Sequence, residues 1–136
     1  ERAGRQAVRV SATTLELLRL AKDLSRETAG AFDVSVGPLW DLWPFRNPRA
    51  PLPSRAQIDQ RLHLVDSTTI ELDEKAGTAY LPNKGMKVNL GAIGKGYAAE
   101  LAIEKMQQLG IERAAISAGG DLYLLGRKIS GPWVVE

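Results

Sequence analysis

The chain has 136 residues, of which 44% are hydrophobic, so it has the size of one domain and enough apolar material for a buried core. Its 18 basic and 16 acidic residues are scattered without runs, which excludes the broad basic face of a nucleic-acid-binding protein. The absence of cysteine excludes disulfides, thiolate metal sites and thiol nucleophiles. We therefore expect one globular domain over residues 1–136.

Both ends of the sequence look cut. The chain starts at Glu1 instead of an initiator Met, and it stops within residues 131–136, which read as a strand. No apolar stretch approaches the roughly 18 residues that a membrane span needs. We expect truncation at both ends, so that a targeting segment or a membrane anchor would lie outside these residues. Composition leaves the cellular compartment open.

Hydrophobic spacing and turn residues predict short strands with interspersed helices. In chain order, we expect a strand at 6–10, helices at 13–30 and 54–63, strands at 68–73, 78–81 and 86–90, a helix at 94–109, and strands at 114–117, 122–125 and 128–136. The capping-box spacings of Thr13 with Glu16 and of Ser54 with Gln57 indicate the first two helix starts. Because hairpins dominate, the pattern is typical of the α+β class with mainly antiparallel pairing.

The stretch KVNLGAIGKGYAAE, residues 87–100, places a lysine among three glycines where a predicted strand gives way to a helix. Glycine lets a ligand approach the main chain, and the first N–H groups of a helix carry a partial positive charge. Lys95 would add an ammonium group, so the stretch is typical of a phosphate site. The alternative is that the glycines only form a tight turn and that Lys95 is solvated; local sequence leaves both open.

Two known phosphate motifs fit this stretch poorly. A Walker A loop is excluded because Lys95 precedes Gly96 and because Tyr97 stands where Ser or Thr is required. The Gly-x-Gly-x-x-Ala spacing from Gly94 matches a dinucleotide fingerprint, with Glu112 near the distance of a ribose-binding acid. That acid should end a strand, whereas Glu112 precedes one. A nicotinamide-binding module is therefore only a distant alternative.

A second set of candidate residues follows the first predicted helix. Ala31, Phe32 and Asp33 offer a main-chain N–H, an aromatic face and a carboxylate in three consecutive positions, which suits a nucleotide-base clamp. Alternatively, Phe32 fills the core and Asp33 caps a turn. Trp40 and Trp43 could stack on a flat ring system, although such a cluster more often belongs to the core or to a packed loop.

Three stretches together resemble the ApbE family of FAD:protein FMN transferases: TAGAFDVSVGPLWDLWPF at 28–45, VNLGAIGKGYAAE at 88–100 and AAISAGGDLYLLG at 114–126. Their order and spacing match, and the resemblance extends over nearly the whole chain. It implies an ApbE-like domain that binds FAD and, with Mg²⁺, moves FMN onto a threonine or serine hydroxyl of an acceptor protein. Many family members act outside the cytoplasmic membrane, so a periplasmic or cell-envelope location is implied.

The resemblance also implies site residues. It places FAD contacts at Ala31, Phe32, Asp33, Asn89 and Lys95, and a magnesium ligand at the main-chain carbonyl of Ala92. Asn89 replaces the aspartate common in the family, which keeps an acceptor oxygen but loses a charge. No catalytic residue is assigned, and His63, the single histidine, is expected to be a surface or capping residue.

The resemblance is incomplete at the C-terminal side, because the family's aspartate and serine or threonine metal ligands lie in a later motif. We therefore expect residues 1–136 alone to show no FMN transfer. Other readings remain: an enzyme that hydrolyses FAD to FMN and AMP, a flavin-binding protein without chemistry, and a structural fragment without a ligand. The sequence does not identify the acceptor protein.

Overall fold

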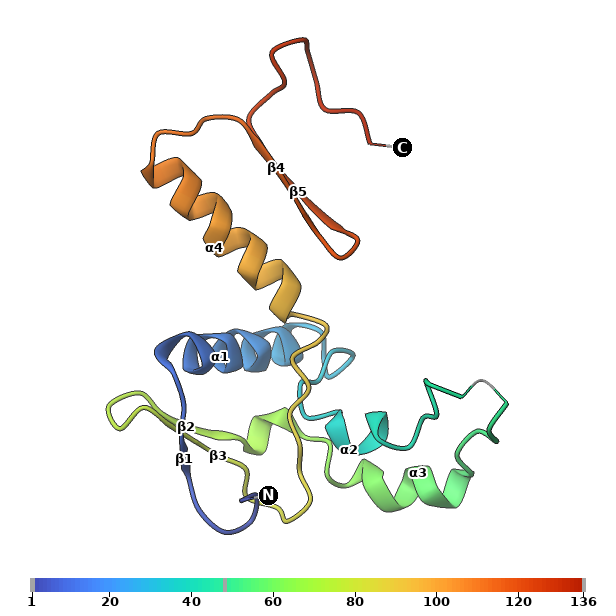
Figure 1. Ribbon diagram of the computed structural model, residues 1–136. Helices are drawn as coiled ribbons and strands as arrows, with labels where there is room; N and C mark the ends of the chain where they lie inside the picture. The colour runs from blue at the N-terminus through green and yellow to red at the C-terminus, as the bar shows by residue number, and fades with distance from the viewer. Residues whose placement is uncertain (1, 48, 136) are drawn as a thin grey trace. The chain divides into compact units, whose positions relative to one another are not determined.

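The computed structural model describes residues 2–47 and 49–135 (Figure 1). It contains helices and antiparallel strand pairs, and the predicted α+β class is confirmed. The backbone divides into two compact units, one up to Leu90 and one from Gly91 onwards. Since one domain can contain two such units, the single-domain organisation stays a prediction. No helix in the described ranges is long and apolar enough to cross a membrane.

The first unit is built around a three-stranded antiparallel sheet. Its described elements are β1 (Val8–Arg9), α1 (Ala12–Glu27), α2 (Gly37–Trp40), α3 (Arg55–Leu62), the 3-10 turn η1 (Ser67–Thr69), β2 (Glu71–Asp73) and β3 (Thr78–Tyr80). The strand order is β1-β3-β2, and Ala79 of β3 lies opposite both Val8 and Leu72. The predicted hairpin around Gly77 is confirmed, but its first strand begins later than expected because η1 precedes it.

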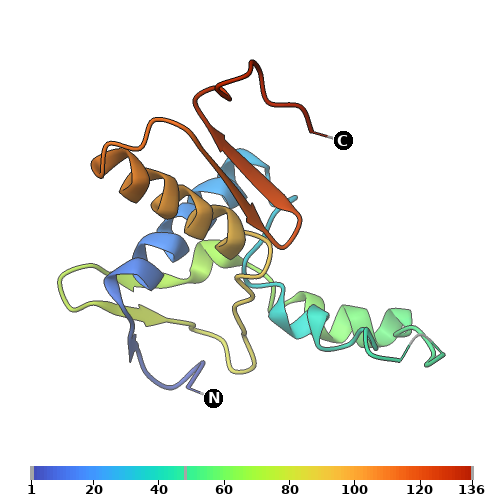
Figure 2. The same cartoon turned by 45° about the horizontal axis from the view of Figure 1, so that its top comes forward.

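Helix α1 lies on one side of this sheet, as both views show (Figures 1 and 2). Thr14 and Leu18 of α1 line an apolar groove of about 270 Å³ together with Val8 and Ala79 of the sheet. The buried apolar side chains of the unit come from α1 and from the connecting segments: Leu15, Leu17, Leu18, Ala21, Val34, Leu64, Ile70 and Met86.

The start of α1 differs from the prediction. Ser11, not Thr13, is the N-cap, and its hydroxyl accepts a hydrogen bond from the Thr14 N–H at 3.1 Å. The Thr14 hydroxyl adds a second contact to the Ser11 hydroxyl at 2.8 Å. The N-cap therefore lies two residues earlier than capping-box spacing suggested, because an N-cap serine needs only an N–H two or three residues later.

The start of α3 agrees with the prediction. The Gln57 N–H donates to the Ser54 hydroxyl and the Ser54 N–H donates to Gln57 Oε1 at 2.8 Å, which completes a capping box. Helix α2 was not predicted. Its first turn contains Pro38, and the missing N–H of proline is tolerated there because the first N–H groups of a helix have no partner within the helix. Trp40, the last residue of α2, stacks on Phe45 of the following loop with 4.3 Å between ring centroids, and both side chains are exposed, so this pair does not belong to the core.

The strand expected at 86–90 is wrong. Among the described residues, this segment forms a parallel bridge between Val36 and Lys87, and the Asn89 N–H donates to the Val34 carbonyl at 2.8 Å, but no strand forms. The partner segment turns into α2 immediately after Val36, so the ladder cannot continue. The pairing is nevertheless important, since it joins two segments that carry predicted site residues.

The second unit consists of α4 (Gly94–Gln108) and the antiparallel hairpin of β4 (Ala114–Ala118) and β5 (Asp121–Leu125). The helix packs along both strands of the hairpin, as Figure 2 shows. Gly110, with a φ of 78°, follows the helix and reverses the chain direction, as its sequence position predicts. The helix and both strands were predicted within one residue of their observed bounds.

The strand expected at 128–136 does not form in the described residues, and its last position lies outside them. Lys128 and Gly131 instead form a bridge that closes a tight turn. The Trp133 indole N–H donates to the Gly126 carbonyl at 2.8 Å, and the Lys128 ammonium lies 5.5 Å from the centroid of the indole ring. These contacts fold the segment back on itself, which removes the extended backbone that a strand requires.

We expect Gly37→Ala to lower the free energy of unfolding by about 1–3 kcal/mol, because the backbone would have to shift. A Cβ at Gly37 would lie 2.6 Å from the Lys87 Cβ and 2.7 Å from the Lys87 carbonyl oxygen. Urea unfolding followed by circular dichroism measures the change. Gly77→Asn is the control, because asparagine tolerates the φ of 66° and the nearest atom is 4.0 Å away. An unchanged midpoint for Gly37→Ala would contradict this packing.

Candidate functional site

The segment Ala31–Asp33 is held by the end of α1. The Thr28 hydroxyl donates to the Leu24 carbonyl at 2.7 Å and accepts the Phe32 N–H at 3.1 Å. The Ala31 N–H donates to the Thr28 carbonyl at 3.0 Å. Thus the N–H groups of Ala31 and Phe32 are both used within this turn, which fixes the direction of the chain into Asp33. Ala31 is exposed and Phe32 is half-buried.

The Asp33 carboxylate accepts three hydrogen bonds from two separate segments. One oxygen accepts the Ser35 N–H at 2.7 Å and the Ser35 hydroxyl at 2.5 Å, and the other accepts the Ser67 N–H at 2.9 Å. Partial burial alone would raise the pKa of Asp33, but the hydrogen bonds from Ser35 and Ser67 outweigh it and lower the pKa. Asp33 is therefore ionised at neutral pH, and it does cap a turn. An FAD contact by Asp33 stays a prediction.

Asn89 lies next to this segment although it is far away in the sequence. Its N–H donates to the carbonyl of Val34, the residue after Asp33, at 2.8 Å. Asn89 itself is half-buried. The structure therefore brings together Asp33 and Asn89, two residues that only the family resemblance had connected.

Asp33 also borders a depression of about 510 Å³ on the surface of the first unit. Gly30, Arg26 and Thr68 contribute to its lining. Gly30 has a φ of 81°, which an L side chain rarely adopts, and no atom lies within 4 Å of the position that its Cβ would take. This glycine leaves main chain exposed beside an ionised carboxylate and a guanidinium group, which is suitable for a polar ligand.

In the second unit, the start of α4 has the features of an anion site. The N-cap residue is Ile93, and no side chain of the described residues caps the helix there. The first N–H groups of the helix therefore keep their partial positive charge available to a ligand. Ala92, the predicted source of a carbonyl ligand, is exposed just before the helix, and Lys95 is exposed in its first turn.

Lys95 is not simply solvated. Its ammonium donates to the Gly119 carbonyl at 2.9 Å and lies 3.3 Å from Asp121 Oδ2. Gly119 lies in the turn between β4 and β5, and Asp121 is the first residue of β5, so the structure joins the lysine of one sequence motif to the Gly-Gly-Asp segment of another. The Lys95 and Asp121 side chains remain 49% and 48% exposed, so a ligand can reach the pair.

Two of the motif glycines have a packing role. A Cβ at Gly96 would lie 3.1 Å from the Tyr123 hydroxyl, and one at Gly119 would lie 3.4 Å from the Lys95 Cδ. Gly119 also has a φ of 59°. Gly96 therefore gives the Tyr123 hydroxyl room beside α4, and Gly119 supplies a φ that an L side chain rarely adopts, whereas the phosphate-site interpretation of residues 87–100 stays a prediction.

The alternatives from the sequence receive little support. The strands that follow α4 are antiparallel, whereas the dinucleotide fingerprint belongs to a parallel strand-helix-strand unit, and Glu112 precedes β4 without ending a strand. His63 is the C-cap of α3 and is exposed, as expected.

The described residues do not by themselves fit a magnesium ion. Within residues 2–47 and 49–135, no group of three or more histidine, aspartate or glutamate side chains gathers in a way that could hold a metal. Mg²⁺ prefers octahedral oxygen coordination with one or two carboxylates. In the second unit, the family resemblance implies one magnesium ligand, the carbonyl of Ala92. The carboxylate of Asp121 is already paired with Lys95.

A family model described as the ApbE family matches residues 1–136. The chain belongs to the ApbE family. The FAD:protein FMN transferase of Klebsiella pneumoniae is 36% identical over 124 residues, which cover 91% of this chain and 39% of that protein. The FAD:protein FMN transferase of Salmonella typhimurium is 35% identical over 131 residues, which cover 93% of this chain and 37% of that protein.

Solved structures of ApbE proteins have the same fold. The ApbE protein of Thermotoga maritima aligns with a TM-score of 0.85 at 31% identity over 96% of this chain and 43% of that chain. The apo form of the Pseudomonas stutzeri flavinyl transferase ApbE aligns with a TM-score of 0.82 at 26% identity over 96% of this chain and 43% of that chain. The chain thus spans less than half the length of these ApbE relatives.

The ApbE motif residues fall in both units. The first unit holds Ala31, Phe32, Asp33 and Asn89, and the second holds Ala92 and Lys95. Sequence reasoning missed Ser35 and Ser67 as partners of Asp33. The Asp-x-Ser spacing of an Asx-turn was the available signal for Ser35, whereas nothing local connects Asp33 to a backbone N–H 34 residues away.

The lowered pKa of Asp33 predicts acid-sensitive stability. The ionised carboxylate contributes fully above its ordinary pKa of 3.8, and the contribution is lost as pH falls through the lower folded value. We expect the free energy of unfolding to fall below about pH 4 and to fall less steeply in Asp33→Asn, as measured by urea titrations at several pH values. Ser35→Ala, which keeps both N–H donors, should be intermediate. Identical pH profiles for wild type and Asp33→Asn would contradict the assignment.

Proposed function

We propose that the protein containing this chain transfers the FMN half of FAD to a threonine or serine hydroxyl of an acceptor protein and releases AMP. Membership of the ApbE family and the names of the relatives support this activity. The proposal is supported at the start of α4, where no side chain of the described residues caps the helix and the Lys95 ammonium lies in the first turn, a combination suited to bind an anion. A periplasmic or cell-envelope location is part of the proposal.

The chemistry requires stabilisation of negative charge. The acceptor hydroxyl oxygen bonds to the FMN phosphorus, the phosphoanhydride bond to AMP breaks with its electron pair going to the AMP oxygen, and the hydroxyl proton is released to solvent. Charge then accumulates on the phosphate of the departing AMP. Lys95 and the N–H groups of α4 are suited to bind the pyrophosphate of FAD and that developing charge, because their positive ends are fixed before the ligand arrives.

Lys95 has a built-in competitor for this role. Its ion pair with Asp121 is about half exposed, and exposed pairs contribute only about 0–1 kcal/mol. A bound pyrophosphate carries more charge than one carboxylate, so exchange of Asp121 for phosphate as the partner of Lys95 is favourable. In the free protein, Asp121 and the Gly119 carbonyl keep the ammonium near the start of α4.

The first unit is proposed to bind the nucleotide through Ala31, Phe32, Asp33 and Asn89. The Asp33 carboxylate is ionised and held by three donors, so it offers fixed acceptor geometry with little further ordering cost. The depression beside it gives a polar ligand access. Asn89 can accept through its side-chain oxygen without adding repulsion toward phosphate.

Mg²⁺ dependence is also proposed, with the Ala92 carbonyl as one ligand. The described residues supply too few oxygen ligands for the ion, so its remaining ligands would come from other parts of the protein. When bound, Mg²⁺ would neutralise phosphate charge. For this reason we propose that residues 1–136 alone do not transfer FMN.

We expect the full-length protein to bind FAD more tightly than NAD and to release AMP when Mg²⁺ and an acceptor are present. Fluorescence titration measures binding, and mass spectrometry of the acceptor measures FMN attachment. Residues 1–136 alone are the control and should attach none. Equal or tighter binding of NAD would overturn the flavin assignment. Release of AMP and free FMN without acceptor labelling would indicate an FAD hydrolase instead.

Lys95→Ala in the full-length protein should weaken FAD binding by about 1–3 kcal/mol, the contribution of one charge-assisted contact, and leave the melting temperature nearly unchanged. Lys105→Ala, in the last turn of the same helix, is the matched control and should retain wild-type affinity, since the positive end of the helix dipole is remote from it. Unchanged affinity in Lys95→Ala would reduce the glycine stretch to a packing role.

A further inference from the structure

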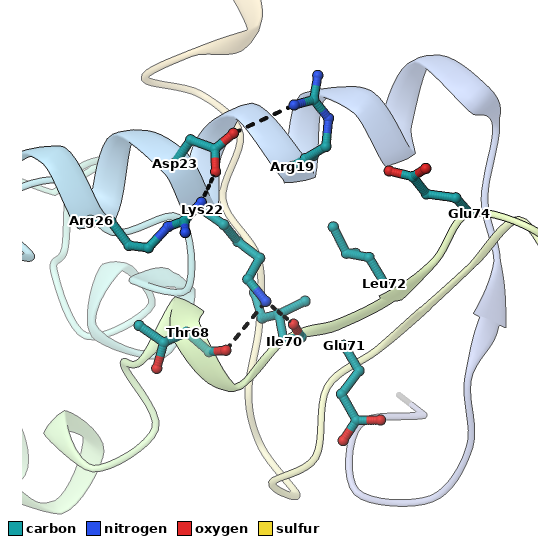
Figure 3. Close-up of a pocket in the computed structure, with 9 residues that line it drawn as sticks. All are labelled: Arg19, Lys22, Asp23, Arg26, Thr68, Ile70, Glu71, Leu72 and Glu74. Atoms are coloured by element: carbon teal, nitrogen blue, oxygen red, sulfur yellow. Dashed lines mark hydrogen bonds and ion pairs between the residues drawn. The ribbon is translucent and has the colours of Figure 1, made fainter.

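We infer that Lys22 is a positioning residue for FAD binding, because it holds the turn that orients Asp33. This inference rests on the proposed function. Lys22 lies on α1, outside the three stretches that resemble the family, and it is half-buried. Its side chain projects toward η1 across a depression of about 620 Å³ (Figure 3).

The Lys22 ammonium binds main-chain carbonyls and not a carboxylate. It donates to the Thr68 carbonyl at 3.2 Å and to the Ile70 carbonyl, which belongs to the residue after η1 (Figure 3). These contacts connect α1 to a turn 46 and 48 residues further along the chain. Because one charge attracts two carbonyl oxygens, it fixes both the position and the orientation of the turn.

The same turn supplies a donor to Asp33. Ser67, the first residue of η1, donates its N–H to Asp33 Oδ2 at 2.9 Å. The Ser67 carbonyl accepts the Ile70 N–H at 3.2 Å, so Ser67 and the residues bound by Lys22 move as one turn. A path of three contacts therefore runs from Lys22 through η1 to the carboxylate of Asp33.

The neighbouring charges on α1 do not share this role. Arg19 and Arg26 lie one turn before and after Lys22, and both pair with the Asp23 carboxylate (Figure 3). Both arginine side chains are largely exposed, so their pairs contribute little to stability. Among the basic residues that line this depression, Lys22 is the one with hydrogen bonds to η1.

Loss of the ammonium should release η1 and weaken the Ser67 contact, so that the Asp33 carboxylate samples other orientations. Binding of FAD would then require reordering of this segment, which raises KM for FAD and leaves the chemical step unchanged. A purely structural lysine would lower the melting temperature without a change in KM at temperatures where the protein is folded.

The experiment compares Lys22→Met, which keeps the apolar stem, with wild type in the full-length protein. We expect KM for FAD to rise roughly 3- to 10-fold with kcat little changed, the scale of the net contribution of one ordinary hydrogen bond. Amide hydrogen exchange of Ser67 should be faster in Lys22→Met without FAD. Lys22→Arg, which restores a charged donor, should recover most of the affinity.

Two controls separate positioning from stability. Arg19→Met removes a charge from the same depression without touching η1 and should keep the wild-type KM. Leu18→Ala, on the helix face toward β1 and β3, should lower the melting temperature at unchanged KM. An unchanged KM and unchanged Ser67 exchange in Lys22→Met would overturn the inference. If the wild-type protein itself binds no FAD, both the proposed function and this inference are wrong. Faster Ser67 exchange in Lys22→Met with an unchanged KM would overturn the inference alone and leave Lys22 a structural role.

Discussion

The hydrogen bonding of the Asp33 carboxylate is the constraint on which the first unit depends. The carboxylate takes donors from Ser35, next to it in the chain, and from the N–H of Ser67, which belongs to a distant turn. A partly buried carboxylate without such partners would be energetically costly. The segment after α1 and the turn η1 must therefore keep their relative position. The hydrogen bond from the Asn89 N–H to the Val34 carbonyl fixes the position of the segment at the end of the first unit in the same way.

In the second unit, a positively charged side chain is likewise held by hydrogen bonding within the protein. Lys95 is held by the Gly119 carbonyl and by Asp121, and the glycines at 96 and 119 allow this approach. In both units, a charged side chain that the family motif provides is already bonded within the protein. Such bonding does not argue against ligand binding, because a side chain whose geometry is fixed in advance loses less entropy when the ligand arrives.

The family assignment and the site geometry contribute different parts of the functional argument. The match over residues 1–136 shows that the chain belongs to the ApbE family, and the class of reaction is a proposal based on that membership, because the chain spans less than half of its relatives. The geometry shows which groups carry charge and how they are held: an ionised Asp33, a paired but accessible Lys95 and an uncapped helix start. Within the described residues, no group of three or more histidine, aspartate or glutamate side chains gathers in a way that could hold a metal ion.

The sequence by itself determined the α+β class, the family, α4 with its hairpin and the capping box of Ser54, because periodicity, caps and turns are encoded within a few residues. It placed the first N-cap wrongly at Thr13 and predicted a strand at 86–90, because a strand depends on partners that local patterns do not specify. Only the tertiary structure decided what Asp33, Lys95 and Lys22 contact. Their long-range hydrogen bonds join Asp33 to the Ser67 N–H, Lys95 to the Gly119 carbonyl and Lys22 to the Ile70 carbonyl, across 24 to 48 residues of chain. Side-chain sequence carries almost no signal for which distant backbone group will lie there.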